Sequence, residues 1–285
     1  MLTLFAKLPL RWLHRLGALL GWLVYLASPR YAARLRENLE KSRVCADPAA
    51  GRRLLRQTVA EAGKSAVELL AVWLRPEDEA LQLMRQRHGW EHVEAALARG
   101  KGIIFLTPHL GCFEITSLYY AARHPITVLY RPPKLRRLQP LLEIGRRRGQ
   151  VTLAPTDMSG VKALLKALKR GEAVGILPDQ APGEGEGVWA EFFGRPAYTM
   201  TLAARLARAT DAAVILAYAE RLPRGEGFDL WLEPLPAGLP DQPREAANFL
   251  NRAIENLIRK LPAQYLWSYN RYKTPRGVEP PPSSP

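Results

Sequence analysis

The segment 107–114, with the sequence TPHLGCFE, contains a histidine and a glutamate five positions apart, His109 and Glu114. An imidazole can accept a proton from a hydroxyl group, and a carboxylate beside it fixes the tautomer and stabilises the imidazolium that forms. Five residues is not a same-face spacing on a helix, but a turn at Gly111 can bring the two side chains together. The segment therefore indicates a general base with an orienting carboxylate and no attached nucleophile. Because a single His–Glu spacing is a weak pattern, a structural histidine is the alternative.

Three other patterns suggest chemistry that we set aside. The stretch HGWEH at 88–92 matches the H-x-x-E-H zinc motif, but Gly89 and Trp90 fit poorly in the helix that this motif requires, and no third ligand is apparent. Cys112 lies close to His109, and we expect a cysteine packed at the start of a helix rather than a thiol nucleophile. The glycines at 183, 185 and 187 do not form a phosphate-binding pattern and predict a mobile acidic loop that borders the substrate. We expect no metal and no bound cofactor.

The elements that must position these residues alternate between helices and strands. Short apolar runs that end in turn residues predict strands at 102–106, 126–130, 151–153, 173–177, 213–219 and 228–232. Helical patterns lie at 53–74, 91–99, 113–122, 135–148, 159–169, 200–209 and 244–261. The last two strands are expected to form a hairpin across the turn at 224–227. This alternation predicts an α/β fold with a mainly parallel central sheet and helices on both faces, in which ligands bind beyond the carboxyl ends of the strands.

The N-terminal segment is both apolar and basic. The run LGALLGWLVYLA at 16–27 follows Lys7, Arg11 and Arg15, and no small-residue cleavage site comes after it, so a secretory signal peptide is not expected. The run is shorter than the roughly 20 residues that span a bilayer, although apolar residues before it lengthen the stretch. We interpret residues 1–28 as a membrane anchor, either a short tilted span or an interfacial helix, with an amphipathic core helix as the alternative. Residues 29–274 then form one domain, and 275–285 a disordered tail.

The net charge narrows the choice of partners. The chain has 41 Lys and Arg against 27 Asp and Glu, a formal net charge of +14, which attracts nucleic acid, an anionic membrane surface or an acidic carrier protein. We find no nucleic-acid motif, and the charge accompanies the apolar N-terminus, so no nucleic-acid partner is expected.

The two cysteines form no CxxC pair, which argues against a disulfide framework and suits a reducing compartment. A basic stretch is equally consistent with docking of an acidic protein or lipid phosphates and with a solvated helix face; it consists of Lys134, Arg136, Arg137, Arg146, Arg147 and Arg148.

Ordered blocks along the chain resemble those of the bacterial lipid A late acyltransferases, the lauroyl and myristoyl transferase family related to glycerophospholipid acyltransferases. The first block is GIIFLTPHLGCFE at 102–114. The others follow in the order of the family: YRP at 130–132, LPDQ at 177–180, FFG at 192–194 with Thr199, QYLW at 264–267 and RYK at 271–273. The resemblance covers nearly the whole chain. One departure is the ending YNRYK at 269–273, where many members have an HRRFK-like ending, and it concerns the acceptor and the chain length more than the reaction type.

The resemblance implies transfer of a fatty acyl chain from an acyl carrier protein thioester to a hydroxyl of a lipid A precursor, at the cytoplasmic face of a bacterial inner membrane. It implies that His109 deprotonates the acceptor hydroxyl and returns the proton to the leaving thiol, while Glu114 holds the ring. Arg131 is expected to bind a sugar phosphate or steady the oxyanion. Asp179 is expected to pair with Arg131, and Gln180 to donate a hydrogen bond to substrate; ordinary surface or loop roles are the alternatives for these three. Acylation of a lysophospholipid or glycolipid, or a non-catalytic basic membrane-binding protein, are the alternative functions.

Overall fold

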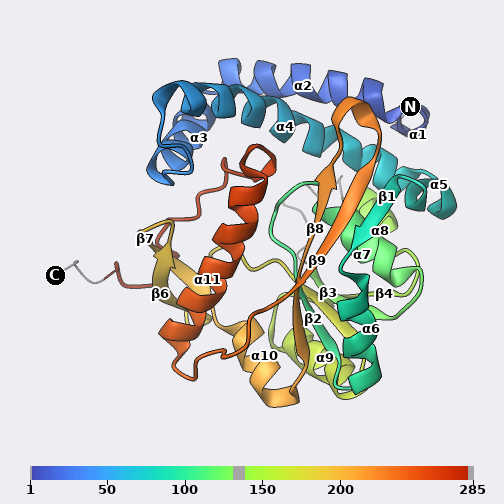
Figure 1. Ribbon diagram of the computed structural model, residues 1–285, viewed down its shortest axis with the longest axis vertical. Helices are drawn as coiled ribbons and strands as arrows, with labels where there is room; N and C mark the ends of the chain where they lie inside the picture. Colours follow the sequence, from blue (N-terminus) through green and yellow to red (C-terminus); the bar gives the residue numbers. More distant parts are fainter. Residues whose placement is uncertain (1, 131–138, 282–285) are drawn as a thin grey trace.

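A seven-stranded sheet forms the centre of the protein (Figure 1). The computed structural model describes residues 2–130 and 139–281. In this part of the chain the strand order is β1-β9-β8-β2-β5-β3-β4. Neighbouring strands are parallel except β8 and β9, which form the expected antiparallel hairpin. The predicted α/β fold with a mainly parallel sheet is therefore confirmed.

The strands follow the predicted runs closely, with two additions. Their bounds are β1 Met84–His88, β2 Ile103–Leu106, β3 Ile126–Tyr130, β4 Val151–Pro155, β5 Ala173–Ile176, β8 Ala213–Arg221 and β9 Phe228–Pro234. Strand β1 was not expected from the sequence, because it is an exposed edge strand with the polar sequence MRQRH and shows no apolar run. The second addition is a separate hairpin of β6 (Gly187–Phe192) and β7 (Arg195–Met200), which lies outside the main sheet.

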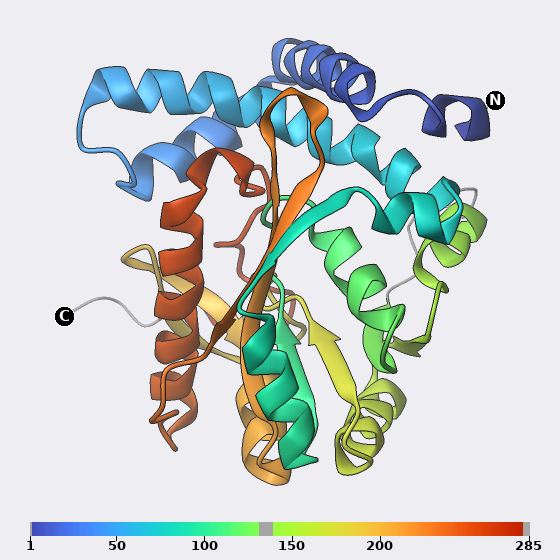
Figure 2. The same cartoon turned by 45° about the vertical axis from the view of Figure 1, so that its right-hand side comes forward.

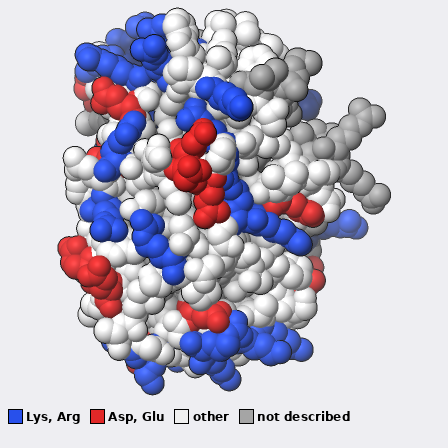
Figure 3. Space-filling view, turned by 90° about the vertical axis from the view of Figure 1, so that its right-hand side faces the viewer, with Lys and Arg blue, Asp and Glu red and all other residues white. Residues whose placement is uncertain are grey.

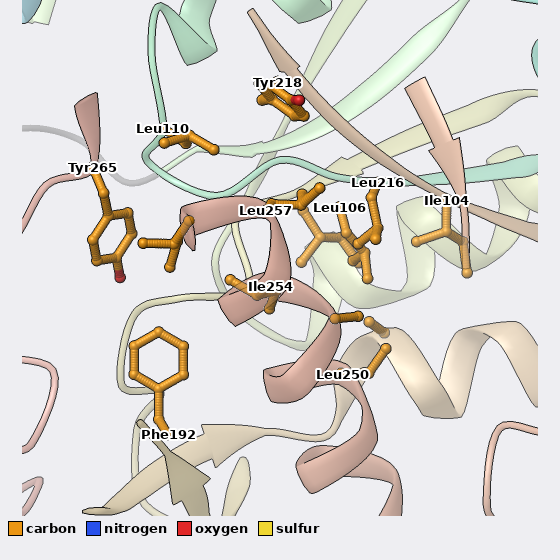
Figure 4. Packing of buried hydrophobic residues seen from close by; sticks show 14 of the residues in the cluster. Ile104, Leu106, Leu110, Phe192, Leu216, Tyr218, Leu250, Ile254, Leu257 and Tyr265 are labelled. Atoms are coloured by element: carbon orange, nitrogen blue, oxygen red, sulfur yellow. The ribbon is translucent and has the colours of Figure 1, made fainter. Parts of the chain in front are cut away.

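Helices cover both faces of the sheet, as predicted. On one face lie α6 (Trp90–Arg99) and α7 (Phe113–Ala121), and on the other α9 (Met158–Lys169), α10 (Leu202–Thr210) and α11 (Pro243–Lys260). In β2, Ile103 and Phe105 pack on the first face, while Ile104 and Leu106 pack on the second, so all four side chains are buried. Figure 4 shows Ile104 and Leu106 in the cluster that includes Ile254 of α11.

The N-terminal helices form a layer across one end of the sheet. They are α1 (Leu2–Ala6), α2 (Leu10–Ala27), α3 (Pro29–Lys41) and α4 (Pro48–Leu74), followed by the short α5 (Glu77–Leu81); α8 (Gln139–Arg146) also packs on α4. Figure 2 shows α2 and α4 side by side, at the end of the molecule toward which β2 and β5 point. Within residues 2–130 and 139–281, no helix combines the length and apolar character needed to cross a membrane.

The C-terminal segment extends across the β6–β7 hairpin. A short 3-10 turn, Pro262–Gln264, follows α11, and another, Pro223–Gly225, lies between β8 and β9. Residues 275–281 form neither helix nor strand. The indole Nε1 of Trp189 in β6 donates a hydrogen bond of 3.0 Å to the carbonyl oxygen of Glu279. The first part of the predicted disordered tail therefore contacts the folded protein.

Candidate active site

The loop after β2 is held in place by its neighbours on both sides. The N–H of Thr107 donates to a carbonyl oxygen of β5 at 3.0 Å, and the carbonyl oxygen of His109 accepts from the N–H of Leu266 at 3.0 Å. Gly111 has a φ of +61°, and a Cβ atom there would collide with the carbonyl oxygen of Ala219 in β8. Only glycine fits this position, so the expected turn at Gly111 is confirmed. These contacts give the His109 backbone a fixed position at the carboxyl end of the central strand.

His109 is oriented by Asp179. The ring nitrogen Nδ1 lies 2.9 Å from Asp179 Oδ1, and the backbone N–H of His109 donates to Asp179 Oδ2 at 3.0 Å. Asp179 is only 3% exposed. Burial opposes ionisation of this carboxyl, but the adjacent His109 ring and its hydrogen bonds hold the pKa of Asp179 below its usual value. An ionised Asp179 accepts a hydrogen bond from an N–H group at Nδ1, and the lone pair of the ring is then on Nε2.

The second ring nitrogen of His109 lies beside Gln180 and a pocket. The amide nitrogen of Gln180 is 3.1 Å from Nε2, and the ring of Phe113 lies 4.7 Å from the imidazole, centroid to centroid. Both His109 and Gln180 line a pocket of about 440 Å³. Nε2 therefore lies at a cavity large enough for part of a lipid or thioester substrate, with the Gln180 amide as its present hydrogen-bond partner.

Glu114 does not contact the His109 ring among the hydrogen bonds of the described residues. Its carboxylate, on the first turn of α7, accepts hydrogen bonds from Nε and Nη2 of Arg146 in α8 and from Nε1 of Trp73 in α4, the latter at 3.3 Å. The expectation that Glu114 turns back to orient His109 is therefore wrong. The physical reason is that Asp179 reaches Nδ1 from the neighbouring parallel strand, while Glu114 points toward α4 and α8, where Arg146 neutralises its charge.

The arginines expected to bind substrate have different outcomes. Arg131 lies outside the described residues, as do Lys134, Arg136 and Arg137, so the predicted pairing of Asp179 with Arg131 stays a prediction. Arg146 is bound to Glu114 and also lines the pocket beside His109. Arg148 donates through Nη1 to the carbonyl oxygen of Val72 at 2.6 Å and through Nη2 to that of Arg75 at 2.8 Å. Arg146 thus connects α8 with α7, and Arg148 connects the turn after α8 with the end of α4.

The pocket has an apolar wall and a polar rim. Leu129, Ile176, Met200 and Leu202 come from the ends of β3, β5 and β7 and the start of α10. The polar lining includes Arg146, Arg205 and Asp157, and the loop before β6 contributes Gly185 and Glu186, so the acidic loop does border the pocket as expected. An apolar wall suits a hydrocarbon chain, and a few polar groups suit the head group that it carries.

Two of the sequence blocks meet behind this site. Arg271 is only 3% exposed, and its guanidinium donates to the carbonyl oxygen of Tyr198 at 2.6 Å and to the hydroxyl of Thr199 at 2.7 Å. Tyr265 is also buried, and both burial and the nearby Asp179 raise the pKa of its hydroxyl. The blocks at 192–199 and 264–273 therefore support the loops that hold His109 and Asp179.

Two of the patterns that we set aside, the H-x-x-E-H stretch and Cys112, contribute no residue to the lining of this pocket. Cys112 is fully buried, and burial raises the pKa of its thiol well above the usual value, as expected of a packed cysteine rather than a nucleophile. His88 ends β1 and stacks on Trp231 at 3.9 Å between ring centroids, whereas His92 lies on α6. The described part of the chain contains no group of three His, Cys, Asp or Glu side chains that could hold a metal ion.

The sequence contains a signal for Asp179 that the pattern of His109 and Glu114 obscured. Leu106 and Ile176, the last residues of β2 and β5, are partners in the parallel register. His109 follows the first by three positions, and Asp179 follows the second by three. Equal offsets after paired parallel strands bring two side chains to the same point on the sheet edge. Arg146 and Trp73, in contrast, are far from this edge in sequence and have no such signal.

Comparison with known proteins identifies the family of this chain. The family model described as bacterial lipid A biosynthesis acyltransferase matches residues 1–274. The lipid A biosynthesis lauroyltransferase of Escherichia coli (strain K12) is 29% identical over 97% of this chain and 90% of its own length, and the palmitoleoyltransferase of the same organism is 26% identical over 96% and 89%. A phosphatidylinositol mannoside acyltransferase of Mycobacterium tuberculosis is 27% identical over 53% of this chain and 49% of its own length. Because the matching family model spans residues 1–274, the protein belongs to the bacterial lipid A biosynthesis acyltransferase family.

Proposed function

We propose that the protein transfers a fatty acyl chain from an acyl carrier protein thioester to a hydroxyl group of a lipid A precursor, at the cytoplasmic face of a bacterial inner membrane. The observation that carries the proposal is the His109 ring, which Asp179 holds through Nδ1 and which directs Nε2 to the pocket. The family match supports the lipid A pathway. The acyl carrier protein donor and the lipid A hydroxyl are inferred from the resemblance to this family.

His109 acts as a general base in this proposal. The acceptor hydroxyl donates its proton to Nε2 as its oxygen attacks the thioester carbonyl carbon, which gives a tetrahedral intermediate. When the carbon–sulfur bond breaks, Nε2 returns the proton to the sulfur of the leaving thiol, so no net proton is consumed. Asp179 remains ionised throughout and stabilises the transient imidazolium. The products are an ester and the free thiol of the carrier protein.

Gln180 changes its partner during the reaction. In the structure its amide nitrogen occupies the hydrogen-bonding position at Nε2, which is the position that the acceptor hydroxyl needs. When the hydroxyl displaces it, the amide N–H group becomes free to donate to the carbonyl oxygen, where negative charge develops in the transition state. Gln180 therefore serves as an oxyanion donor in this proposal, rather than only as a substrate contact.

Different parts of the pocket suit the acyl chain and the head group of the substrate. The hydrocarbon chain lies against the apolar wall formed by Leu129, Ile176, Met200 and Leu202, since this burial removes apolar surface from water. Arg146 and Arg205 line the same pocket, and guanidinium groups bind phosphate well. The glucosamine phosphates of a lipid A precursor fit this charge.

A second candidate is acylation of another membrane lipid, such as a glycolipid or a lysophospholipid. The similarity to a phosphatidylinositol mannoside acyltransferase over half of the chain favours it. That protein is named for a glycolipid acceptor, so the same base would serve a different hydroxyl.

Acceptor profiling tests both candidates. Protein purified in detergent is incubated with a mixture of acyl carrier protein thioesters and a Kdo-bearing tetra-acylated lipid A precursor, and the products are read by mass spectrometry. We expect one added acyl mass, and His109→Ala should reduce its rate by about 100-fold or more. His92→Ala is the matched control, because His92 is a partly exposed histidine on α6, away from the pocket. Product with a lysophospholipid or glycolipid alone selects the second candidate, and full activity of His109→Ala refutes the mechanism.

A further inference from the structure

The N-terminal helices expose an apolar surface that the described part of the protein does not cover. Of the large hydrophobic side chains that the structure leaves exposed, all but Ile144 and Met158 lie on α1 and α2. Those on α2 are between 41% and 73% exposed; they are Trp12, Leu16, Leu19, Leu20, Leu23, Val24 and Leu26, which we call the outer face of α2. Their spacing of three, four and seven residues places them on one side of the helix. A continuous apolar surface of this kind is typical of a membrane or protein contact.

The opposite face of α2 is fixed to α4. Gly17 and Gly21 approach Gly63 so closely that a Cβ atom on Gly17 would lie 2.7 Å from the carbonyl oxygen of Gly63. His14 Nε2 lies 3.0 Å from the carboxylate of Glu68, and both side chains are buried. If α2 left α4 to stand across a bilayer, it would expose this carboxylate and separate the glycine contact. The packing therefore holds α2 lengthwise along the protein.

Basic side chains border the outer face. The first 36 residues contain six Lys and Arg, no Asp and no Glu; the exposed ones include Lys7, Arg11, Arg15, Arg30 and Arg34. The Arg15 guanidinium lies 4.7 Å from the centre of the Trp12 ring, at the edge of the apolar surface. Figure 3 shows Lys and Arg side chains gathered at the upper left of one side view of the molecule. An apolar helix face with a basic border is complementary to a bilayer that contains anionic lipids.

We propose that α2 lies flat in the interface of an anionic bilayer, with its outer face buried among the lipids and its inner face kept on α4. The inference rests on the proposed membrane-lipid substrate and adds how the protein sits on the membrane. In this orientation the bilayer lies on the α2–α4 side of the molecule, toward which the carboxyl ends of β2 and β5 point (Figure 2). Trp73 of α4 contacts Glu114 at the start of α7, so α4 connects the docked helix with the catalytic loop.

Depth measurements distinguish a flat helix from a spanning one. Trp12, Leu19 and Leu26 are all exposed, and their spacing of seven residues puts them on one side of the helix, about 21 Å apart along the axis from first to last at 1.5 Å per residue. Each is replaced by cysteine in a Cys45→Ser background, in which Cys112 remains buried, and is labelled with an environment-sensitive fluorophore. The protein is bound to vesicles of phosphatidylcholine and phosphatidylglycerol in a 3:1 ratio, and lipids with quenchers at known depths report the position of each label. Lys162, an exposed residue on α9, carries the control label.

We expect the same shallow depth for the three α2 labels and no quenching at Lys162. A depth that changes steadily from Trp12 to Leu26 would show a spanning helix and overturn the proposal, and so would labels that stay accessible to an aqueous quencher. A second experiment tests the basic side chains with the double variant Arg11→Glu/Arg15→Glu. This variant should bind the anionic vesicles at least tenfold more weakly than the unchanged protein. Unchanged binding contradicts the role of the basic side chains beside the outer face of α2. Acyl transfer by the unlabelled protein in detergent micelles is measured separately. Correct depths without any transfer would refute the proposed function alone, and transfer with wrong depths would refute this inference alone.

Discussion

Asp179→Asn tests which carboxylate serves His109 in the proposed mechanism. Asp179 accepts two hydrogen bonds from His109, one from the backbone N–H into Oδ2 and one from the ring into Oδ1. An asparagine has only one acceptor oxygen. If that oxygen keeps the hydrogen bond from the His109 backbone, the asparagine NH2 group faces Nδ1 of the ring. It then stabilises the imidazole tautomer that carries its proton on Nε2. In this tautomer Nε2 has no lone pair and cannot act as a base.

The expected loss follows from these contacts. A hydrogen bond to a charged group contributes about 1.5–3 kcal/mol, and because each 1.4 kcal/mol is a factor of ten in rate, loss of the bond to the imidazolium lowers kcat about 10- to 150-fold. The wrong tautomer extends the loss to about 10⁴-fold, as in serine protease triads. KM should change little, because Asp179 is buried and is not among the residues that line the pocket.

The assay compares Asp179→Asn with Glu114→Gln, using initial rates of acyl transfer and circular dichroism to verify folding. Glu114→Gln leaves the His109–Asp179 pair intact and weakens only the contact with Arg146. It should therefore lower kcat less than Asp179→Asn and raise KM more, since Arg146 lines the pocket. The reasoning is refuted if a folded Asp179→Asn protein keeps more than a third of wild-type kcat, or if Glu114→Gln is the more damaging of the two for kcat.

Three further substitutions test the loop, the pocket and the N-terminal packing. Gly111→Ala should lower the unfolding temperature by several degrees and reduce activity, because the φ of +61° is strained for alanine and the new Cβ collides with Ala219; calorimetry measures this. Met200→Trp narrows the pocket and should shift the preference in a thioester mixture to shorter chains, since each methylene that no longer fits costs ~1–3 kcal/mol. Glu68 is buried, and despite that burial Arg221 lowers the pKa of Glu68 from 4.5 to about 2. The ionised carboxylate therefore contributes about 3 kcal/mol to the free energy of unfolding above pH 4.5. This contribution is lost as the pH falls toward 2. Denaturant unfolding should show that Glu68→Gln is less stable than wild type at pH 7 and loses less stability at pH 3.

The sequence predicted the order of the main elements because the central strands are buried on both faces. The runs IIFL of β2 and AVGI of β5 are wholly buried, so their apolar character is strong and their ends are marked by the turn residues that follow. An edge strand such as β1 has one row of neighbours and an exposed, polar sequence, and no hydrophobic pattern reveals it. Strand order depends on contacts between distant segments, which local patterns do not contain. The β6–β7 hairpin joins neighbouring segments across Phe193 and Gly194, and it was missed although its contacts are local.

The N-terminal segment shows a similar limit. Its apolar run was recognised, but α2 has two different apolar faces, and the sequence does not separate them. Gly17 and Gly21 form the face that approaches α4, while Leu19 and Leu23 belong to the outer face. Only the presence of a partner helix with its own glycine, Gly63, distinguishes a packed face from a free one.

The separation between Asp179 and Glu114 has a consequence for catalysis. Only interactions that become stronger in the transition state accelerate a reaction. The charge of Glu114 is compensated by Arg146 before substrate binds, and that pair is unchanged when His109 takes up a proton. In the proposed mechanism the charge of Asp179 faces the ring before and after His109 takes up the proton, so this contact strengthens as the proton moves. The glutamate of the H-x4-E pattern would then contribute to the pocket through Arg146, whereas the stabilisation that lowers the barrier would come from Asp179, a carboxylate seventy residues after His109.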